Sequence, residues 1–193
     1  MSAAATSIAM TLEEWAELDE DDSRELIDGF LEEEEMPSAI HETVVRWLMM
    51  ILDRTFGGQG GFVFGSGLKL AVRMRSGRMP DVSWYGPGKK PEARGVVRVP
   101  PDIVVEVVSP TPRDERRDRI EKPDDYAAFG VKYYWMVDPE FRSFEVWELG
   151  SDGRYVRAAA ATSGAAVRVP GYENFTIDLD ALWAEVERLE KTE

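Results

Sequence analysis

Two acidic residues stand in apolar, strand-like segments, where a carboxylate needs a chemical reason to be. Glu106 lies within Ile103–Val108, in which five β-branched residues surround one carboxylate. A buried carboxylate must be paired, protonated or bound to a cation, because burying it unpaired is costly. Asp81 follows Pro80 at the start of a second such segment, Asp81–Tyr85. Two carboxylates on adjacent strands can converge on one hard cation, and Mg²⁺ prefers oxygen ligands.

Both acids also have ordinary structural explanations. Glu106 could form a salt bridge with an arginine, since structural ion pairs also occur inside proteins. An acidic residue after a proline is common in turns, so Asp81 by itself is a weak signal. The residues alone leave the metal site and the structural roles open.

Lys122 is a candidate cationic partner for the two acids. It follows the Glu106 segment in a run of basic residues with Arg113, Arg116, Arg117 and Arg119. A helix that leaves a strand returns across the sheet, so a lysine on its inner face could reach the carboxylates. Acidic residues interleave with this run at i+3 and i+4, and this spacing by itself favours a solvated lysine. Pro123 predicts that the helix bends at Lys122 or restarts there, with the proline in its first turn.

The composition of the 193-residue chain excludes several other kinds of site. It has no cysteine, which excludes disulfides and thiolate metal sites. Its single histidine, His41, excludes a site with two imidazoles, and a lone histidine is more often structural than catalytic. No apolar run approaches the roughly 20 residues of a membrane span, and we expect a cytoplasmic protein.

Charge is distributed unevenly along the chain. The formal net charge is −14, and residues 1–35 contribute −12 of it, with thirteen acids against one base. Residues 66–100 carry a local charge of +6, and with the loop Gly86–Gly95 they form a candidate phosphate-tracking surface. The acidity of the whole chain argues against a protein that coats DNA passively.

Apolar periodicity and turn signals predict an α/β domain over residues 11–193, after a disordered segment at 1–10. A strand at 103–108, a helix at 113–129 and a strand at 131–137 require a right-handed crossover, so part of the sheet is parallel. A hairpin over 143–160 makes the sheet mixed. The other predicted elements are helices at 11–20, 38–56 and 180–189, a hairpin at 24–36 around Asp28-Gly29, and strands within 62–72.

Several motifs follow in a specific order along the chain. They are Glu25-Leu26-Ile27-Asp28-Gly29, His41, Pro80-Asp81, Pro101 to Pro110, Arg117 to Lys122, Tyr126, Tyr134-Trp135 and Val137-Asp138-Pro139. This series closely resembles the Uma-two family of predicted bacterial endonucleases, within the PD-(D/E)XK nuclease superfamily. The resemblance covers about residues 11–183.

The resemblance implies a restriction endonuclease-like core, a mixed central sheet flanked by helices, with an added N-terminal hairpin and C-terminal hairpin. It also implies an endonuclease that uses Mg²⁺ (or Mn²⁺) to hydrolyse DNA. Asp81 and Glu106 match the metal ligands, with the backbone carbonyl of Val107 as a third. Val108 occupies the usual position of the superfamily lysine, and Lys122 matches a lysine displaced to the following helix. His41 and Glu25 match recurring family positions and are candidate catalytic residues without an assigned role.

The resemblance to dimeric nucleases, together with six tryptophans that could supply an apolar surface patch, favours a homodimer. Trp135 and Trp147 on late strands are the candidates for that patch. Two other functions stay open at this point. One is a catalytically inactive nuclease-fold protein that binds nucleic acid or a partner protein, and the other is a hydrolase of small phosphodiesters.

Overall fold

The computed structural model describes residues 9–19, 22–33, 36–109, 111 and 116–191. Residues 1–8 of the predicted disordered segment lie outside this part, as do Arg113 and the predicted helix start at 113–115. One domain over residues 11–193 stays a prediction.

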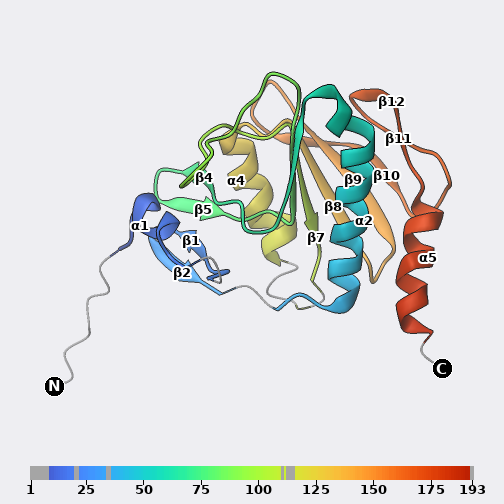
Figure 1. Cartoon of the computed structure of the whole chain (residues 1–193), viewed down its shortest axis with the longest axis horizontal. Helices are drawn as coiled ribbons and strands as arrows, with labels where there is room; N and C mark the ends of the chain where they lie inside the picture. Colours follow the sequence, from blue (N-terminus) through green and yellow to red (C-terminus); the bar gives the residue numbers. More distant parts are fainter. Residues whose placement is uncertain (1–8, 20–21, 34–35, 110, 112–115, 192–193) are drawn as a thin grey trace.

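A six-stranded sheet forms the centre of the fold, in the order β10-β9-β8-β7-β6-β3 (Figure 1). Its strands are β3 (Phe62–Gly65), β6 (Val82–Tyr85), β7 (Ile103–Val107), β8 (Tyr133–Asp138), β9 (Ser143–Leu149) and β10 (Tyr155–Ala161). β7 and β8 pair in parallel, and the other neighbours pair antiparallel. The predicted mixed sheet is therefore confirmed, as is the β9–β10 hairpin.

Helices cover both faces of this sheet. Helices α2 (Ala39–Phe56) and α5 (Leu179–Glu190) pack on one face, in a core that includes Val105 and Trp135. Helix α4 (Lys122–Phe129) packs on the other face through Tyr126, which shares a core with Val104 and Tyr134. Successive residues of β7 thus enter different cores, as the pleat of a strand requires, and every residue of β7 is buried.

A smaller sheet lies beside the centre, in the order β2-β1-β5-β4 (Figure 1). Its strands are β1 (Glu25–Ile27), β2 (Phe30–Glu32), β4 (Leu70–Arg73) and β5 (Ser76–Arg78), with the short helix α1 (Leu12–Ala16) packed near them. Asp28 and Gly29 both have positive φ, 51° and 90°, which is the two-residue hairpin turn predicted there. Strand β5 was not predicted. A Cβ on Gly77 would lie 2.1 Å from the Trp15 ring, so this strand needs glycine for close packing.

The predicted helix starts agree with the structure. The Ser38 side chain accepts a hydrogen bond from the His41 amide at the start of α2, and Thr11 and Glu14 form a capping box at α1. The helix predicted over 113–129 is instead a π-helical segment, η2 (Arg117–Glu121), followed by α4. Pro123 lies in the first turn of α4, directly after the π-helical segment.

The remaining elements lie toward the C-terminus and after α2. A 3₁₀ turn, η1 (Gly57–Gln59), ends α2, and an unpredicted pair of strands, β11 (Val167–Val169) and β12 (Tyr172–Ile177), precedes α5. Among the described residues, no helix combines the length and apolar character needed to cross a membrane.

The tryptophans do not form the expected surface patch. Trp135 is fully buried, as are Trp15, Trp84 and Trp183 within a few percent, while Trp47 and Trp147 are partly buried. They supply core volume, because a fused ring buries more apolar area than other side chains. The argument for a homodimer from exposed tryptophan is therefore wrong.

Candidate active site

Asp81 and Glu106 are neighbours across two antiparallel strands. Val82 lies opposite Val105, and Ser83 lies opposite Val104, so one further step in the same register places Asp81 opposite Glu106. Directly opposed residues project to the same face of a sheet with their Cβ atoms about 5 Å apart. The Asp81 Oδ2 accepts a hydrogen bond from the Val107 amide at 2.7 Å, and both acids line one cavity of about 170 Å³.

Two side chains of α4 bind the Glu106 carboxylate. Glu106 is 1% exposed; its Oε2 accepts from Lys122 Nζ at 2.8 Å, and its Oε1 accepts from the Tyr126 hydroxyl at 2.5 Å. Burial, and then the Glu106 charge, raise the pKa of Tyr126, so the phenol keeps its proton and acts as the donor. The cation that α4 supplies to Glu106 is therefore a lysine, and not the arginine considered from the sequence.

Lys122 is buried, contrary to the solvated lysine that its spacing favoured. It is 4% exposed, and its Nζ also lies 3.1 Å from the Asp118 Oδ1. Asp118 belongs to the π-helical segment η2, and such segments occur frequently at functional sites. Burial raises the pKa of Asp118 despite the Lys122 charge, which lowers it. Four acidic residues therefore line the cavity, Glu42, Asp81, Glu106 and Asp118, and Glu106 and Asp118 contact Lys122.

His41 joins this group from the first turn of α2. Its Nε2 lies 3.2 Å from the Asp81 Oδ2, and its Nδ1 lies 3.7 Å from a Glu42 carboxylate oxygen. Burial lowers the pKa of His41, but the hydrogen bond and the charge of Asp81, with that of Glu42, raise it further, and the net direction is upward. The imidazole thus contacts the Asp81 carboxylate and lines the same cavity.

Glu25 is not among the residues that line this cavity. It is fully buried, with Oε2 at 2.5 Å from Arg78 Nη1 and Oε1 accepting from the Met79 amide at 3.0 Å. Arg78 also contacts Asp125 of α4, at 2.7 Å from its Nη2, and Arg73 contacts the same carboxylate. This ion-pair network joins β1, β5 and α4, and α4 carries Lys122 and Tyr126.

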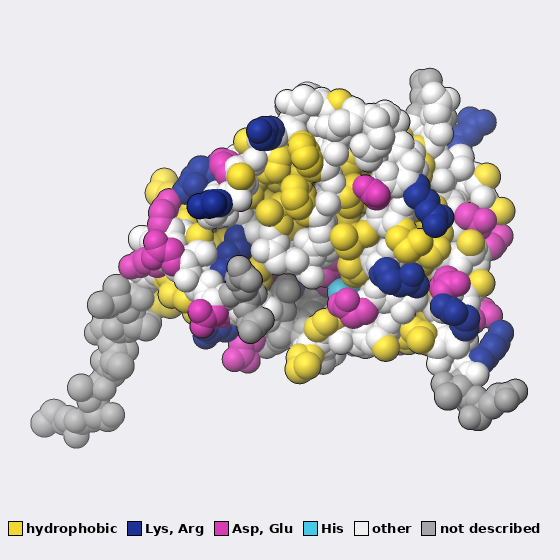
Figure 2. Space-filling model, in the orientation of Figure 1, with side chains coloured by type: hydrophobic (Ala, Val, Ile, Leu, Met, Phe, Trp, Pro, Cys, Tyr) yellow, Lys and Arg dark blue, Asp and Glu magenta, His cyan; other side chains and the backbone are white. Residues whose placement is uncertain are grey.

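The basic segment 66–100 does not present a continuous basic surface. Lys89 pairs with Asp102 at 2.7 Å, Arg98 pairs with Glu13, and Arg78 is buried in the network above. On the face in view, outside the grey residues, Figure 2 shows basic and acidic side chains interspersed. The local excess of +6 along the sequence is therefore largely offset by acids that the fold brings close.

The cavity residues fit a hard divalent cation by their chemistry. Asp81, Glu106 and Val107 line it, and the two carboxylates offer oxygen ligands of the kind Mg²⁺ prefers. In the part of the chain that the structure describes, no group of three or more His, Asp or Glu side chains is arranged to hold a metal. A cation here would depend on two carboxylates and a backbone oxygen, with waters in the other positions, as is usual for Mg²⁺.

Tyr126 and Asp118 are the members of the site that were not predicted as site residues. Both lie four positions from Lys122, one on each side, and residues at this spacing share a helix face. That spacing was the available signal. The spacing identifies these two residues only once Lys122 is known to face the sheet, and the packing of α4 in the structure is what shows this.

The mixed sheet and its flanking helices define a restriction endonuclease-like α/β protein. Residues 10–180 match the model of the Uma2 family, described as "Putative restriction endonuclease", and the chain belongs to this family. A nuclease-like function follows from that membership, and the resemblance found in the sequence is confirmed.

A solved structure shares the fold. The chain is similar to "a putative nuclease belonging to DUF820" from Anabaena variabilis ATCC 29413, with a TM-score of 0.73 and 17% sequence identity. The similarity covers 92% of this chain and 99% of the other. No curated protein matches the chain.

Proposed function

We propose that this protein is a divalent-metal-dependent nuclease that hydrolyses phosphodiester bonds in DNA, with Mg²⁺ or Mn²⁺ as cofactor. The observation that carries the proposal is the contact of Lys122 with Glu106 in the cavity that Asp81 also lines. Two carboxylates and a lysine at one point are the groups that metal-assisted phosphodiester hydrolysis needs. Family membership supports the same reaction class.

A bound Mg²⁺ would lower the pKa of a coordinated water and neutralise charge on the phosphate. The Asp81 and Glu106 carboxylates and the Val107 carbonyl are the proposed ligands. The ammonium of Lys122 holds the Glu106 carboxylate in place, and it would orient the attacking water or offset charge that develops on the phosphate. We assign this chemistry to Lys122 because Val108, at the usual lysine position, has no charge.

Two further side chains position the ligands. The Tyr126 hydroxyl fixes the Glu106 carboxylate from the side opposite to Lys122, and His41 Nε2 contacts the Asp81 carboxylate. Hydrogen bonds to ligand carboxylates set the orientation of these ligands. Loss of such a bond typically lowers metal affinity or activity by about 10–100-fold. We therefore propose positioning roles for Tyr126 and His41, and a structural role for Glu25.

The test is cleavage of supercoiled plasmid DNA by the purified protein with Mg²⁺ or Mn²⁺, and with EDTA as the metal-free arm. Asp81→Asn and Glu106→Gln should each abolish cleavage while circular dichroism shows an intact fold. Glu145→Gln is the matched control, because Glu145 lies in the same row across the sheet as Glu106, with Met136 between them. Glu145 is outside the cavity, so this variant should cleave like the wild type.

The alternatives from the sequence give different results in the same assay. An inactive nuclease-fold protein would cleave under no metal condition. A hydrolase of small phosphodiesters would act on bis-p-nitrophenyl phosphate or a cyclic nucleotide and spare the plasmid. Full plasmid cleavage by Glu106→Gln would exclude the proposed site.

We also propose a homodimer, since cutting both strands of a duplex benefits from two sites. Sedimentation at micromolar concentration tests this, and a single species of monomer mass would contradict it.

A further inference from the structure

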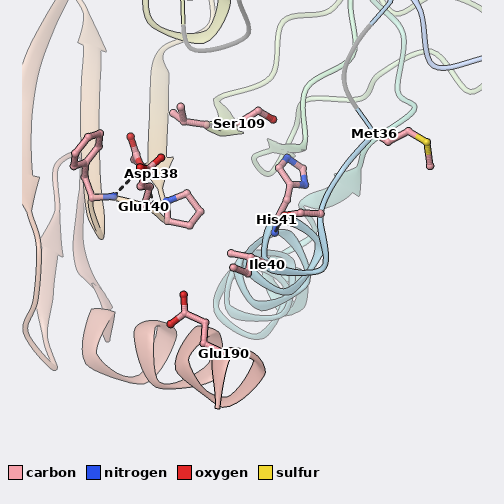
Figure 3. A pocket seen from close by; sticks show the side chains of 11 residues that line it. Met36, Ile40, His41, Ser109, Asp138, Glu140 and Glu190 are labelled. Carbon is pink, nitrogen blue, oxygen red and sulfur yellow. Dashed lines mark hydrogen bonds between the residues drawn. The ribbon is translucent and has the colours of Figure 1, made fainter. Parts of the chain in front are cut away.

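A second cavity, of about 350 Å³, adjoins the candidate active site. The two cavities share Met36, His41 and Ser109 in their walls. The second one lies beyond the carboxyl ends of the parallel strands β7 and β8, and it extends to the C-terminal end of α5 (Figure 3). Ligands of open α/β sheets bind outside the carboxyl ends of the strands. Whatever occupies this cavity is therefore close to a substrate in the candidate active site.

An exposed aromatic ring lies in the wall of this cavity on a fixed turn. Phe141 is 68% exposed, so its side chain is accessible from solvent. The Asp138 Oδ1 accepts hydrogen bonds from the Glu140 and Phe141 amides, at 3.0 Å each, and its Oδ2 pairs with Arg119. Arg142, the next residue, has a positive φ of 48°. Residues with strained backbone angles cluster at functional sites, and here two hydrogen bonds to Asp138 hold the turn.

The exposed charges of this cavity are negative, although His41 also lines it, and they disfavour a phosphate. Its walls are apolar at Ile40, Val108 and Pro139, and its exposed charged side chains are Glu140 and Glu190. Of the described residues that line it, none is lysine or arginine. Carboxylates repel phosphate but accept hydrogen bonds from amino groups. These walls fit a planar, uncharged group that has an apolar face and an amino donor.

We infer that this cavity receives an unpaired nucleobase with an exocyclic amino group, such as adenine, from the strand whose phosphate lies in the candidate active site. This inference rests on the proposed nuclease function and names its substrate class, DNA with single-stranded or locally unpaired bases. Phe141 supplies the stacking surface, and Glu140 and Glu190 supply the acceptors. Enzymes that take a base out of the duplex read it in this way, by stacking and by hydrogen bonds to its edge.

The distribution of charge agrees with this substrate class. A protein that tracks intact duplex needs a continuous basic surface, and the chain has a net charge of −14 with Arg73, Arg78, Lys89 and Arg98 of its basic segment paired to acids. Stacking of a base on an aromatic ring adds a contact that does not depend on charge. An unpaired base would thus contribute binding energy beyond that of the phosphate contacts.

The test is fluorescence anisotropy in EDTA with three labelled DNA probes of one sequence: a duplex, the duplex with one bulged adenine, and the same bulge without its base. We expect the wild type to bind the adenine bulge roughly tenfold more tightly than the abasic bulge, as base stacking on an aromatic ring provides. Phe141→Leu should lose this difference while it keeps its affinity for the plain duplex. Phe141→Tyr is the matched control and should retain the difference.

The result in EDTA is independent of hydrolysis, so the two proposals fail separately. Equal binding of the adenine and abasic bulges by the wild type would overturn the base site, even if the protein cleaves DNA. So would an adenine preference that persists in Phe141→Leu. A preference without cleavage in Mg²⁺ would instead leave the base site standing and remove the nuclease proposal. Glu190→Gln, which leaves the ring intact, should narrow the preference for adenine over thymine at the bulge.

Discussion

Lys122 Nζ donates a hydrogen bond to Glu106 Oε2 at 2.8 Å, although sixteen positions separate the two residues and both are almost completely buried. The contact exists because the chain leaves β7, passes through η2 and returns across the sheet as α4. Two charges taken out of water are tolerated only when they are paired and their other hydrogen bonds are made. Tyr126 and Asp118 make such bonds to this pair.

Replacement of Lys122 by Met should abolish cleavage and also weaken the fold. The Glu106 carboxylate would stay buried without its cation, which typically costs about 3–5 kcal/mol. Removal of a charged group at the reaction centre commonly costs about 10²–10³-fold in rate. Urea unfolding and plasmid cleavage, measured on the same preparation, give the two effects.

The double variant Lys122→Met/Glu106→Gln separates a buried pair from two independent side chains. It should be more stable than Lys122→Met, since the neutral amide no longer needs a cation. Additive losses in the double variant would contradict the pair.

Removal of the Tyr126 hydroxyl should affect both stability and activity. Tyr126→Phe deletes a hydrogen bond to a charged group, worth about 2 kcal/mol, and removes one of the two donors of α4 that orient Glu106. Loss of a group that orients a ligand typically lowers activity by about 10–100-fold. The matched control is Tyr155→Phe, which deletes a hydroxyl bonded to the Val131 carbonyl at 2.7 Å, outside the candidate active site. Similar cleavage rates for the two variants would remove the positioning role of Tyr126.

Glu25→Gln should lower stability and spare chemistry. The change removes one charge of a fully buried pair with Arg78, a loss of about 3 kcal/mol, but keeps an acceptor for the Met79 amide. Cleavage per folded molecule should remain within about twofold of the wild type, since Glu25 is not among the residues lining the cavity. A variant that is folded, stable and inactive would instead make Glu25 catalytic. Cleavage by this variant has to be measured at a temperature below its unfolding midpoint, and differential scanning calorimetry gives that midpoint.

Local sequence predicted the strand, the helix cap and the turn around this site, but not the burial of Lys122. The apolar run around Glu106, the Ser38 cap of α2 and the Asp28-Gly29 turn each depend on a few neighbouring residues, and all three are in the structure. The burial of Lys122 depends on which face of η2 and α4 meets the sheet. Interleaved acids and bases give that segment no apolar stripe from which to read the inner face. Strand β5 was missed for a related reason, because Ser76-Gly77-Arg78 has no apolar alternation and is held by Trp15 and by Glu25 from distant positions.

Asp118→Asn should stabilise the protein increasingly as the pH rises. Burial raises the pKa of Asp118 in the folded state above its unfolded value of about 4. For an acid shifted in this direction, the stability that its protonated form contributes is present at low pH and is lost as the pH rises through the folded pKa. The amide variant cannot ionise and escapes this loss.

The measurement for Asp118 is the difference in melting temperature between Asp118→Asn and the wild type, from pH 4 to pH 8 without added metal. The difference should grow in favour of the variant over this range and then level off. A difference that is constant, or that shrinks as the pH rises, would show that Lys122 stabilises the ionised carboxylate more than burial disfavours it.

The proposed active site requires Asp81 and Glu106 to hold one divalent cation together. Isothermal titration calorimetry with Mn²⁺ on the wild type, Asp81→Asn, Glu106→Gln and Glu145→Gln tests it directly. One Mn²⁺ should bind each wild-type and Glu145→Gln chain, and binding should disappear in both of the other variants. Stoichiometric Mn²⁺ binding that survives in either Asp81→Asn or Glu106→Gln, or that is absent from the wild type, would contradict the claim.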